Sequence, residues 1–99
     1  MITEEIKAKN YEIFLQKIEN YGVTKETIEK VFGDSLLNAT YAIDTQNHMA
    51  YEGSLLHIVL RSLIPYAIKI NDVLPDNLKC DKDTIIKVGL LQHLAKAFM

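Results

Sequence analysis

The fold of this 99-residue chain is decided by the stretch Ser54-Leu55-Leu56-His57-Ile58-Val59-Leu60-Arg61-Ser62-Leu63-Ile64-Pro65-Tyr66-Ala67-Ile68-Lys69-Ile70-Asn71-Asp72. As a helix it is apolar on most sides, and a helix of this kind usually lies in the centre of a fold. Ser54 can cap its N-terminus with its hydroxyl group. Pro65 lacks a backbone N–H, so we expect a kink or a break into two helices there. The stretch therefore predicts a central, buried helix.

Two amphipathic helices are predicted on its N-terminal side. Thr3 can cap the first helix and Gly22 can end it, because glycine tolerates the left-handed conformation found after helices. Thr24 and Gly33 play the same two roles for a shorter second helix. Apolar residues at helical spacing support both helices: Ile6, Ile13, Phe14, Ile18, Tyr21, Ile28, Val31 and Phe32. The charged residues between them are of both signs and predict a solvated outer face.

The rest of the chain predicts loops and one further helix. Residues 36–51 are rich in turn formers and predict a loop with at most one short helical turn. After a stop at residues 74–77, Asp81 or Asp83 can cap a last helix that we expect to run to the end of the chain. No segment alternates apolar and polar residues as a half-buried strand does. The prediction is one all-α domain over residues 1–99, a compact bundle of four or five helices with an N-terminal pair (1–33) and a core (34–99).

Composition excludes several classes of partner. The chain is 48% hydrophobic and 24% charged, with a net charge of -2. This balance provides no basic stripe for nucleic acid and no basic patch for an anionic membrane. The most apolar stretch is too short and too often interrupted by polar residues to span a bilayer. A single cysteine, Cys80, allows no intramolecular disulfide and favours a reducing, cytoplasmic location.

Two motifs resemble the two halves of the HD-domain phosphohydrolase site. The first is His48-Met49-Ala50-Tyr51-Glu52-Gly53-Ser54-Leu55-Leu56-His57-Ile58, and the second is Gly89-Leu90-Leu91-Gln92-His93-Leu94-Ala95-Lys96-Ala97. The family reads roughly H-x-x-Y-E-G-G-L-L-x-H and then A-L-L-H-D-L-G-K. This resemblance implies an HD-like helical core from about residue 37 to residue 97. In the family, a metal held between facing helices activates water and neutralises the charge of the phosphate being cleaved.

The chain departs from this family at the positions that carry the chemistry. Ile58 stands where the family has its first metal-binding histidine, and Gln92 and His93 stand where it has the His-Asp pair. An isoleucine cannot ligate a metal, an amide replaces imidazole poorly, and His93 removes a carboxylate charge. The resemblance therefore implies a degenerate member, a pseudoenzyme with no catalytic residue, no cofactor and no metal. It also implies that Ile58, Gln92 and His93 are vestiges of a site.

Two functions remain open at this point. The first is a non-catalytic HD-like protein that acts through protein–protein interaction, as an accessory or structural subunit of a larger assembly. The last residues, Leu94 to Met99, are largely apolar, and an uncovered apolar surface favours association. We therefore expect a protein partner, or self-association, through the C-terminal helix. The resemblance adds that such a protein could be encoded by a phage or mobile element and act in the cytoplasm or in a phage particle.

The alternative is a small metal-dependent phosphohydrolase that acts on nucleotides through a remodelled histidine site. His48, His57 and His93 would be its ligands if the fold brought them together. His57 immediately precedes Ile58, but neighbouring residues on a helix point about 100° apart. His57 is therefore not a simple replacement for the histidine of the family, and a helix-surface position is the expected one.

Overall fold

The computed structural model describes residues 2–41, 51–92, 94 and 97, and the regular structure in them is helical throughout. The elements are α1 (Glu4–Glu19), α2 (Lys25–Phe32), α3 (Ser35–Asn38), α4 (Ser54–Ile58), a π-helix (Val59–Leu63), α5 (Ile64–Asp72), a 3-10 turn (Asp76–Leu78) and α6 (Lys82–Leu91). The π-helix joins α4 to α5, so these three segments form one continuous helix, and the described residues contain five helices in all. The predicted all-α class is confirmed.

The N-terminal helices begin and end where local chemistry places them. The hydroxyl oxygen of Thr3 accepts a hydrogen bond from the backbone N–H of Ile6 at 3.1 Å. Thr24 caps α2 in the same way. Gly22 and Gly33 follow the two helices with φ of 86° and 56°, values that a residue with a side chain rarely adopts. Both predicted helices are confirmed.

Pro65 does not end the central helix, but the hydrogen bonding just before it changes from the α-helical to the π-helical pattern. Pro65 is the second residue of α5 and follows directly on the π-helix. A proline ring clashes with the carbonyl four residues earlier and cannot donate to it. The wider π turn relieves this conflict while the chain stays helical, in keeping with the use of such turns as single insertions within α-helices.

The cap predicted for the central helix is wrong. Gly53, not Ser54, is the N-cap residue, in a left-handed conformation with φ of 81°. Ser54 is the first helical residue, and its hydroxyl accepts a hydrogen bond from the backbone N–H of Tyr41 at 2.7 Å. The hydroxyl is thus engaged by the preceding loop.

The core lies between α1 and the first half of the central helix. α1 packs against α3 and α4 and also contacts α2 and α6. The fully buried large apolar side chains are Phe14, Ile18, Leu36, Leu55 and Leu90. Because α1 and α3 belong to the same core as α4, the N-terminal helices and the later helices form one structural unit.

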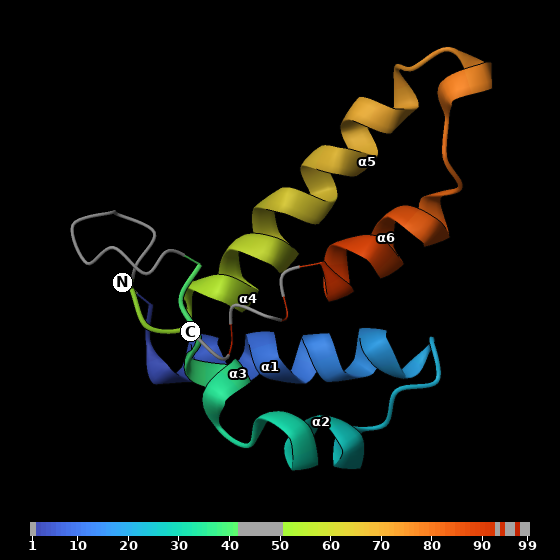
Figure 1. Cartoon of the computed structure of the whole chain (residues 1–99). Helices are drawn as coiled ribbons and strands as arrows, with labels where there is room; N and C mark the ends of the chain where they lie inside the picture. The colour runs from blue at the N-terminus through green and yellow to red at the C-terminus, as the bar shows by residue number, and fades with distance from the viewer. Residues whose placement is uncertain (1, 42–50, 93, 95–96, 98–99) are drawn as a thin grey trace.

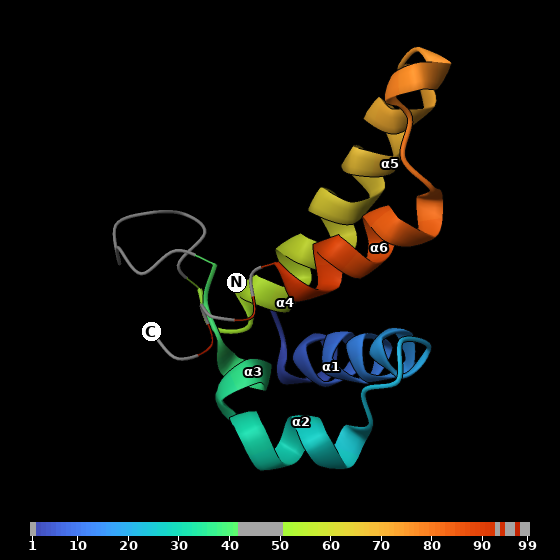
Figure 2. The ribbon, with the colours of Figure 1, turned by 45° about the vertical axis from the view of Figure 1, so that its right-hand side comes forward.

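The second half of the central helix leaves this core. α5 projects away from the layer made by α1, α2 and α3, and α6 returns alongside it (Figures 1 and 2). We call residues 63–92 the α5–α6 hairpin. Asn71 connects the two limbs of the hairpin. Its side-chain nitrogen donates to the carbonyl of Cys80, and its side-chain oxygen accepts from the N–H of Cys80, both at 2.9 Å. The prediction of a helix buried along its whole length is therefore wrong for α5.

The start of α6 is tied to the end of α1. The hydroxyl of Tyr21 lies 3.0 Å from a carboxylate oxygen of Asp83 and 3.2 Å from the backbone carbonyl of the same residue. The ammonium of Lys87 lies 5.8 Å from the centre of the Tyr21 ring, within cation–π range. These contacts fix where α6 starts relative to α1.

The last helix is shorter than predicted. α6 ends at Leu91, Gln92 lies in a turn, and Leu94 and Ala97 have 3-10 geometry. Asp81 precedes α6 as its N-cap residue, but its side chain makes no capping hydrogen bond. Over the described residues, no helix has both the length and the apolar character needed to cross a membrane.

Candidate functional site

The three positions that stand for the metal ligands of the HD family have different surroundings. Ile58 is the half-buried last residue of α4. Gln92 is exposed directly after α6 and lines a groove between α5 and α6. His93 lies outside the described residues. The described part of this set therefore consists of one aliphatic side chain and one neutral amide.

Of the three histidines of the alternative metal site, the structure describes only His57. Its Nδ1 lies 3.0 Å from the hydroxyl of Tyr51, and the two rings meet edge to face with centres 6.0 Å apart. His48 and His93 lie outside the described residues, so the structure does not say whether the three histidines meet. Within residues 2–41, 51–92, 94 and 97, no three histidine, cysteine, aspartate or glutamate side chains are grouped to hold a metal ion.

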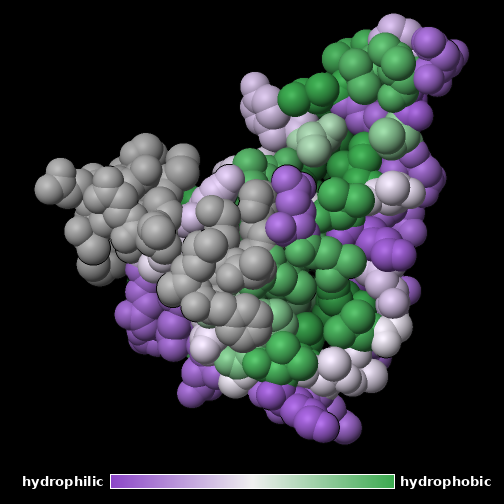
Figure 3. Space-filling model, in the orientation of Figure 1, coloured by the Kyte–Doolittle hydropathy of each residue, from purple (hydrophilic) through white to green (hydrophobic). Residues whose placement is uncertain are grey.

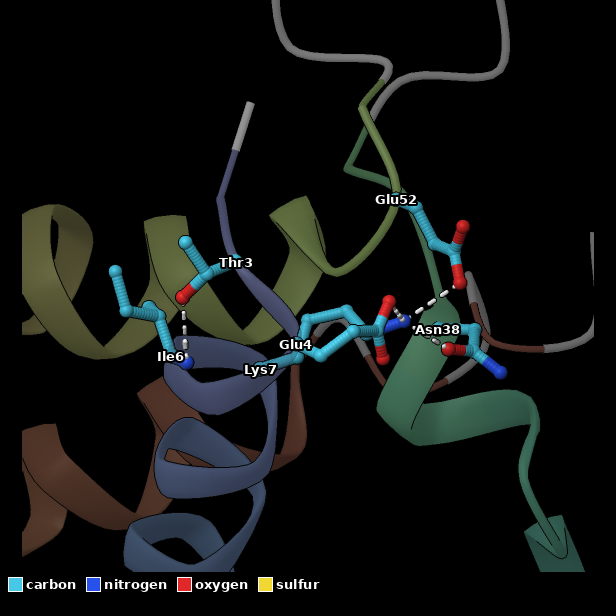
Figure 4. Close-up of polar contacts among 6 residues, drawn as sticks. All are labelled: Thr3, Glu4, Ile6, Lys7, Asn38 and Glu52. Carbon is cyan, nitrogen blue, oxygen red and sulfur yellow. Dashed lines mark hydrogen bonds and ion pairs between the residues drawn. The ribbon is translucent and has the colours of Figure 1, made fainter.

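A cluster of polar side chains around Lys7 accounts for part of the first motif (Figure 4). Lys7 lies on α1 and is only 4% exposed. Its ammonium donates to Oδ1 of Asn38 at 2.7 Å and to Oε1 of Glu52 at 2.6 Å, and it forms an ion pair with Glu4 at 3.1 Å. One lysine thus joins α1, α3 and the segment that leads into α4.

Backbone contacts complete this junction. The N–H of Gly53 donates to the carbonyl of Asn38 at 3.2 Å, and the N–H of Leu55 donates to the carbonyl of Ala39 at 3.0 Å. Gly53 lies so close to α1 that a Cβ at its position would be 2.5 Å from Cγ of Lys7. The run Glu52-Gly53-Ser54 therefore forms the start of the central helix and packs it on α1.

The ionisation of Lys7 is linked to folding. The hydrogen bond to Glu52 raises the pKa of Lys7 above its usual value, burial opposes this rise, and Glu4 adds to it. A pKa that is higher in the folded state means that the stabilisation is complete below the unfolded pKa, about 10.4. It is then lost as the pH rises through the folded pKa.

We expect Lys7→Met to lower the urea midpoint of unfolding at pH 8 more than Lys9→Met, a matched change at an exposed lysine of the same helix. The loss should remain a modest part of the total stability, because Glu4 and Glu52 are largely exposed. The difference between wild type and Lys7→Met should shrink at pH 11 and above. Burial also raises the pKa of Tyr11 and Tyr21, but the effect of these tyrosines on stability is the same in wild type and in Lys7→Met and cancels in the difference. Equal midpoints for the two variants at pH 8 would contradict the stabilising role given to the contacts of Lys7.

An apolar groove lies between the limbs of the hairpin. It has a volume of about 480 Å³ and is open to solvent. Its lining is mostly aliphatic, with a few polar groups at the edges: Tyr41, Leu63, Ile64, Ala67, Cys80, Thr84, Ile85, Val88, Gly89 and Gln92. The groove has this shape partly because Gly89 lets α6 approach Ile64 closely: a Cβ on Gly89 would be 2.5 Å from Cγ1 of Ile64.

Exposed apolar side chains also lie along the hairpin outside the groove. Tyr66 on α5 is 67% exposed, and Val73, which follows α5 in a turn, is 82% exposed. The hydrophobic surface recurs from the tip of the hairpin down to the level of α1 (Figure 3). We define the hairpin face as the groove together with these exposed residues: Leu63, Tyr66, Ile70, Val73, Leu78, Val88 and Leu91.

Four exposed apolar residues, from the last residue of the π-helix through α5 to the residue that follows it, have a regular spacing. Leu63, Tyr66, Ile70 and Val73 are separated by three, four and three residues, which is the a/d spacing of helices that pack against other helices. Such a stripe is normally buried against a second helix, and here it faces solvent. This spacing was available in the sequence, but the apolar residues on the other sides of the helix hid it.

The contacts of Lys7 could not be found from any pattern in the sequence. Lys7 is 31 residues from Asn38 and 45 residues from Glu52, and nothing local to any of them predicts the cluster.

Comparisons of this chain with models of known protein families, with curated proteins and with solved structures find no match. The resemblance to HD domains consequently rests on the two motifs and stays a prediction.

Proposed function

We propose that this chain is a non-catalytic, HD-like helical protein that acts by binding a helix of a protein on its hairpin face, as an accessory or structural subunit of an assembly. The observation that carries the proposal is the exposed a/d stripe of Leu63, Tyr66, Ile70 and Val73, on a hairpin that also holds an apolar groove. Apolar side chains at this spacing pack into the surface of a second helix. An exposed apolar surface of several hundred Å² is also typical of interaction sites on soluble proteins.

The side-chain contacts of two motif residues, Glu52 and His57, support a binding role. Glu52, the acid of the first motif, is held by Lys7 at 2.6 Å. His57 is engaged by the hydroxyl of Tyr51. Both side chains thus have partners that account for them within the fold, whereas Tyr66, Ile70 and Val73 of the hairpin face remain largely exposed.

The test uses the full chain with an environment-sensitive fluorophore on Cys80, which is the only cysteine, is exposed and borders the groove. At sub-micromolar protein, the labelled chain is titrated with a synthetic amphipathic peptide of about three heptads that has leucine at positions a and d. We expect a saturable blue shift of the emission. A peptide of the same composition with the leucines scrambled should not produce this shift.

Two variants localise the effect. Val88→Glu places a charge on the wall of the groove and should weaken peptide binding by about 1–2 kcal/mol, which is roughly 5- to 30-fold. Val31→Glu makes the same change at an exposed valine of α2 and should leave binding unchanged. Equal binding of the scrambled peptide, or equal weakening by both variants, would show that the groove is not a specific helix site.

A further inference from the structure

We propose that the helix bound by the hairpin face is α5 of a second copy of this chain, so that two hairpins form an antiparallel four-helix bundle. This inference rests on the proposed function and names its partner. Three features of the hairpin point to a second copy: its charge, the symmetry of its stripe and the size of its face.

The hairpin is electrically neutral although the chain is not. Between residues 63 and 92 it carries four lysines (Lys69, Lys79, Lys82 and Lys87) and four aspartates (Asp72, Asp76, Asp81 and Asp83). The net charge of -2 therefore comes entirely from the rest of the chain. Two hairpins can approach without net repulsion, whereas a strongly basic or acidic partner helix would find no complementary charge.

The stripe from Leu63 to Val73 matches itself when one copy is reversed. Its four residues are symmetric about residue 68, so that Tyr66 lies opposite Ile70 of the second copy and Leu63 lies opposite Val73 of the second copy. A two-fold axis makes each of these contacts twice. A parallel pair would instead set Lys69 against the same lysine of the other copy and Asp72 against the same aspartate, which brings like charges together. Antiparallel helix dipoles also favour the reversed arrangement.

The size of the face agrees with a dimer. Seven apolar side chains of the hairpin face are at least 36% exposed. Together with the groove they place an exposed apolar surface of several side chains on one hairpin, and a standard stable interface buries about 800 Å² per partner. The a/d spacing of the stripe corresponds to the shallow crossing angle of four-helix bundles.

The test is sedimentation velocity of the full chain over a concentration series. We expect a species of twice the 11.3 kDa monomer mass. Tyr66→Lys and Ile70→Glu each place a charge at the centre of the antiparallel contact and should raise the dimer dissociation constant at least tenfold. Val31→Glu and Ile6→Glu, at exposed apolar residues outside the hairpin, should not change it. Circular dichroism of each variant shows whether it is folded; we expect all four to fold, because surface substitutions usually change stability by only about 0.5 kcal/mol.

Mixing the two hairpin variants tests the orientation. In a heterodimer of Tyr66→Lys and Ile70→Glu, the new lysine meets the new glutamate once, and the native Tyr66–Ile70 contact forms once. We expect the mixture to dimerise where each variant alone does not. A monomeric wild type, a dimer lost in Val31→Glu or Ile6→Glu instead, or a mixture that stays monomeric would each overturn the inference. Binding of the synthetic peptide to a monomeric wild type would leave the proposed function standing and refute only the second copy as its partner.

Discussion

Replacing Gly53 by alanine should lower the free energy of unfolding by about 2–4 kcal/mol, a large part of the stability of a domain of this size. Two separate causes add at this residue. Gly53 has φ of 81°, where a Cβ costs about 1–2 kcal/mol. The new Cβ would also lie 2.5 Å from Cγ and 2.8 Å from Cδ of Lys7, whose ammonium is held by three acceptors and cannot simply move away.

Chemical denaturation of wild type, Gly53→Ala and Gly22→Ala separates the two causes. Gly22 has φ of 86° and nothing within 4 Å of a new Cβ, so Gly22→Ala measures the conformational cost alone. Gly53→Ala should be the more destabilising of the two by at least about 1 kcal/mol. This excess should disappear in a Lys7→Ala background. Equal effects of the two glycine variants in the native background would mean that Lys7 is not packed on Gly53.

Replacing Gly89 by alanine should destabilise the chain by about 1–2 kcal/mol, although the same change in the middle of an exposed helix stabilises by about 1 kcal/mol. The reason is the close approach of α6 to Ile64, where the added Cβ would lie 2.5 Å from Cγ1 and 3.0 Å from Cδ1. Ile64 is buried and has little room to move. α6 would therefore have to shift away from α5, which would also widen the groove.

The decisive comparison is a double-mutant cycle with Ile64→Ala. Removal of the isoleucine side chain leaves space for the new Cβ, so only the gain in helix propensity remains. We expect Gly89→Ala to change sign and to stabilise the Ile64→Ala protein. If Gly89→Ala destabilised both backgrounds equally, the close approach of α6 to α5 at this point would be refuted.

The parts of the fold that follow from local chemistry could be predicted from the sequence. Thr3 and Thr24 cap helices with their own hydroxyl groups, and Gly22 and Gly33 end helices because of their own conformational freedom. The signal at Pro65 is equally local, but the predicted break into two helices is wrong, because a π-helix joins α4 to α5 in one continuous helix. In each case the residue carries the physical cause of the structure that it forms.

The parts that depend on distant contacts could not be predicted. Ser54 has the composition of an N-cap, but the amide of Tyr41 occupies its hydroxyl and Gly53 becomes the cap. Glu52 has the character of a site residue, and only the fold shows that it meets Lys7. The exposure of Tyr66 and Val73 likewise depends on which sides of the central helix the rest of the chain covers. A helix that is apolar on most sides does not reveal which of those sides the rest of the chain will cover.

The central claim is that the hairpin face, and no other surface, binds a helix. The most direct measurement is amide NMR of the ¹⁵N-labelled chain during titration with the leucine heptad peptide. The account predicts chemical-shift changes concentrated at Leu63, Tyr66, Val73, Val88 and Leu91, with α2 and the outer face of α1 unchanged. Changes centred on α2 or on the Lys7 cluster, or no change at saturating peptide, would contradict it.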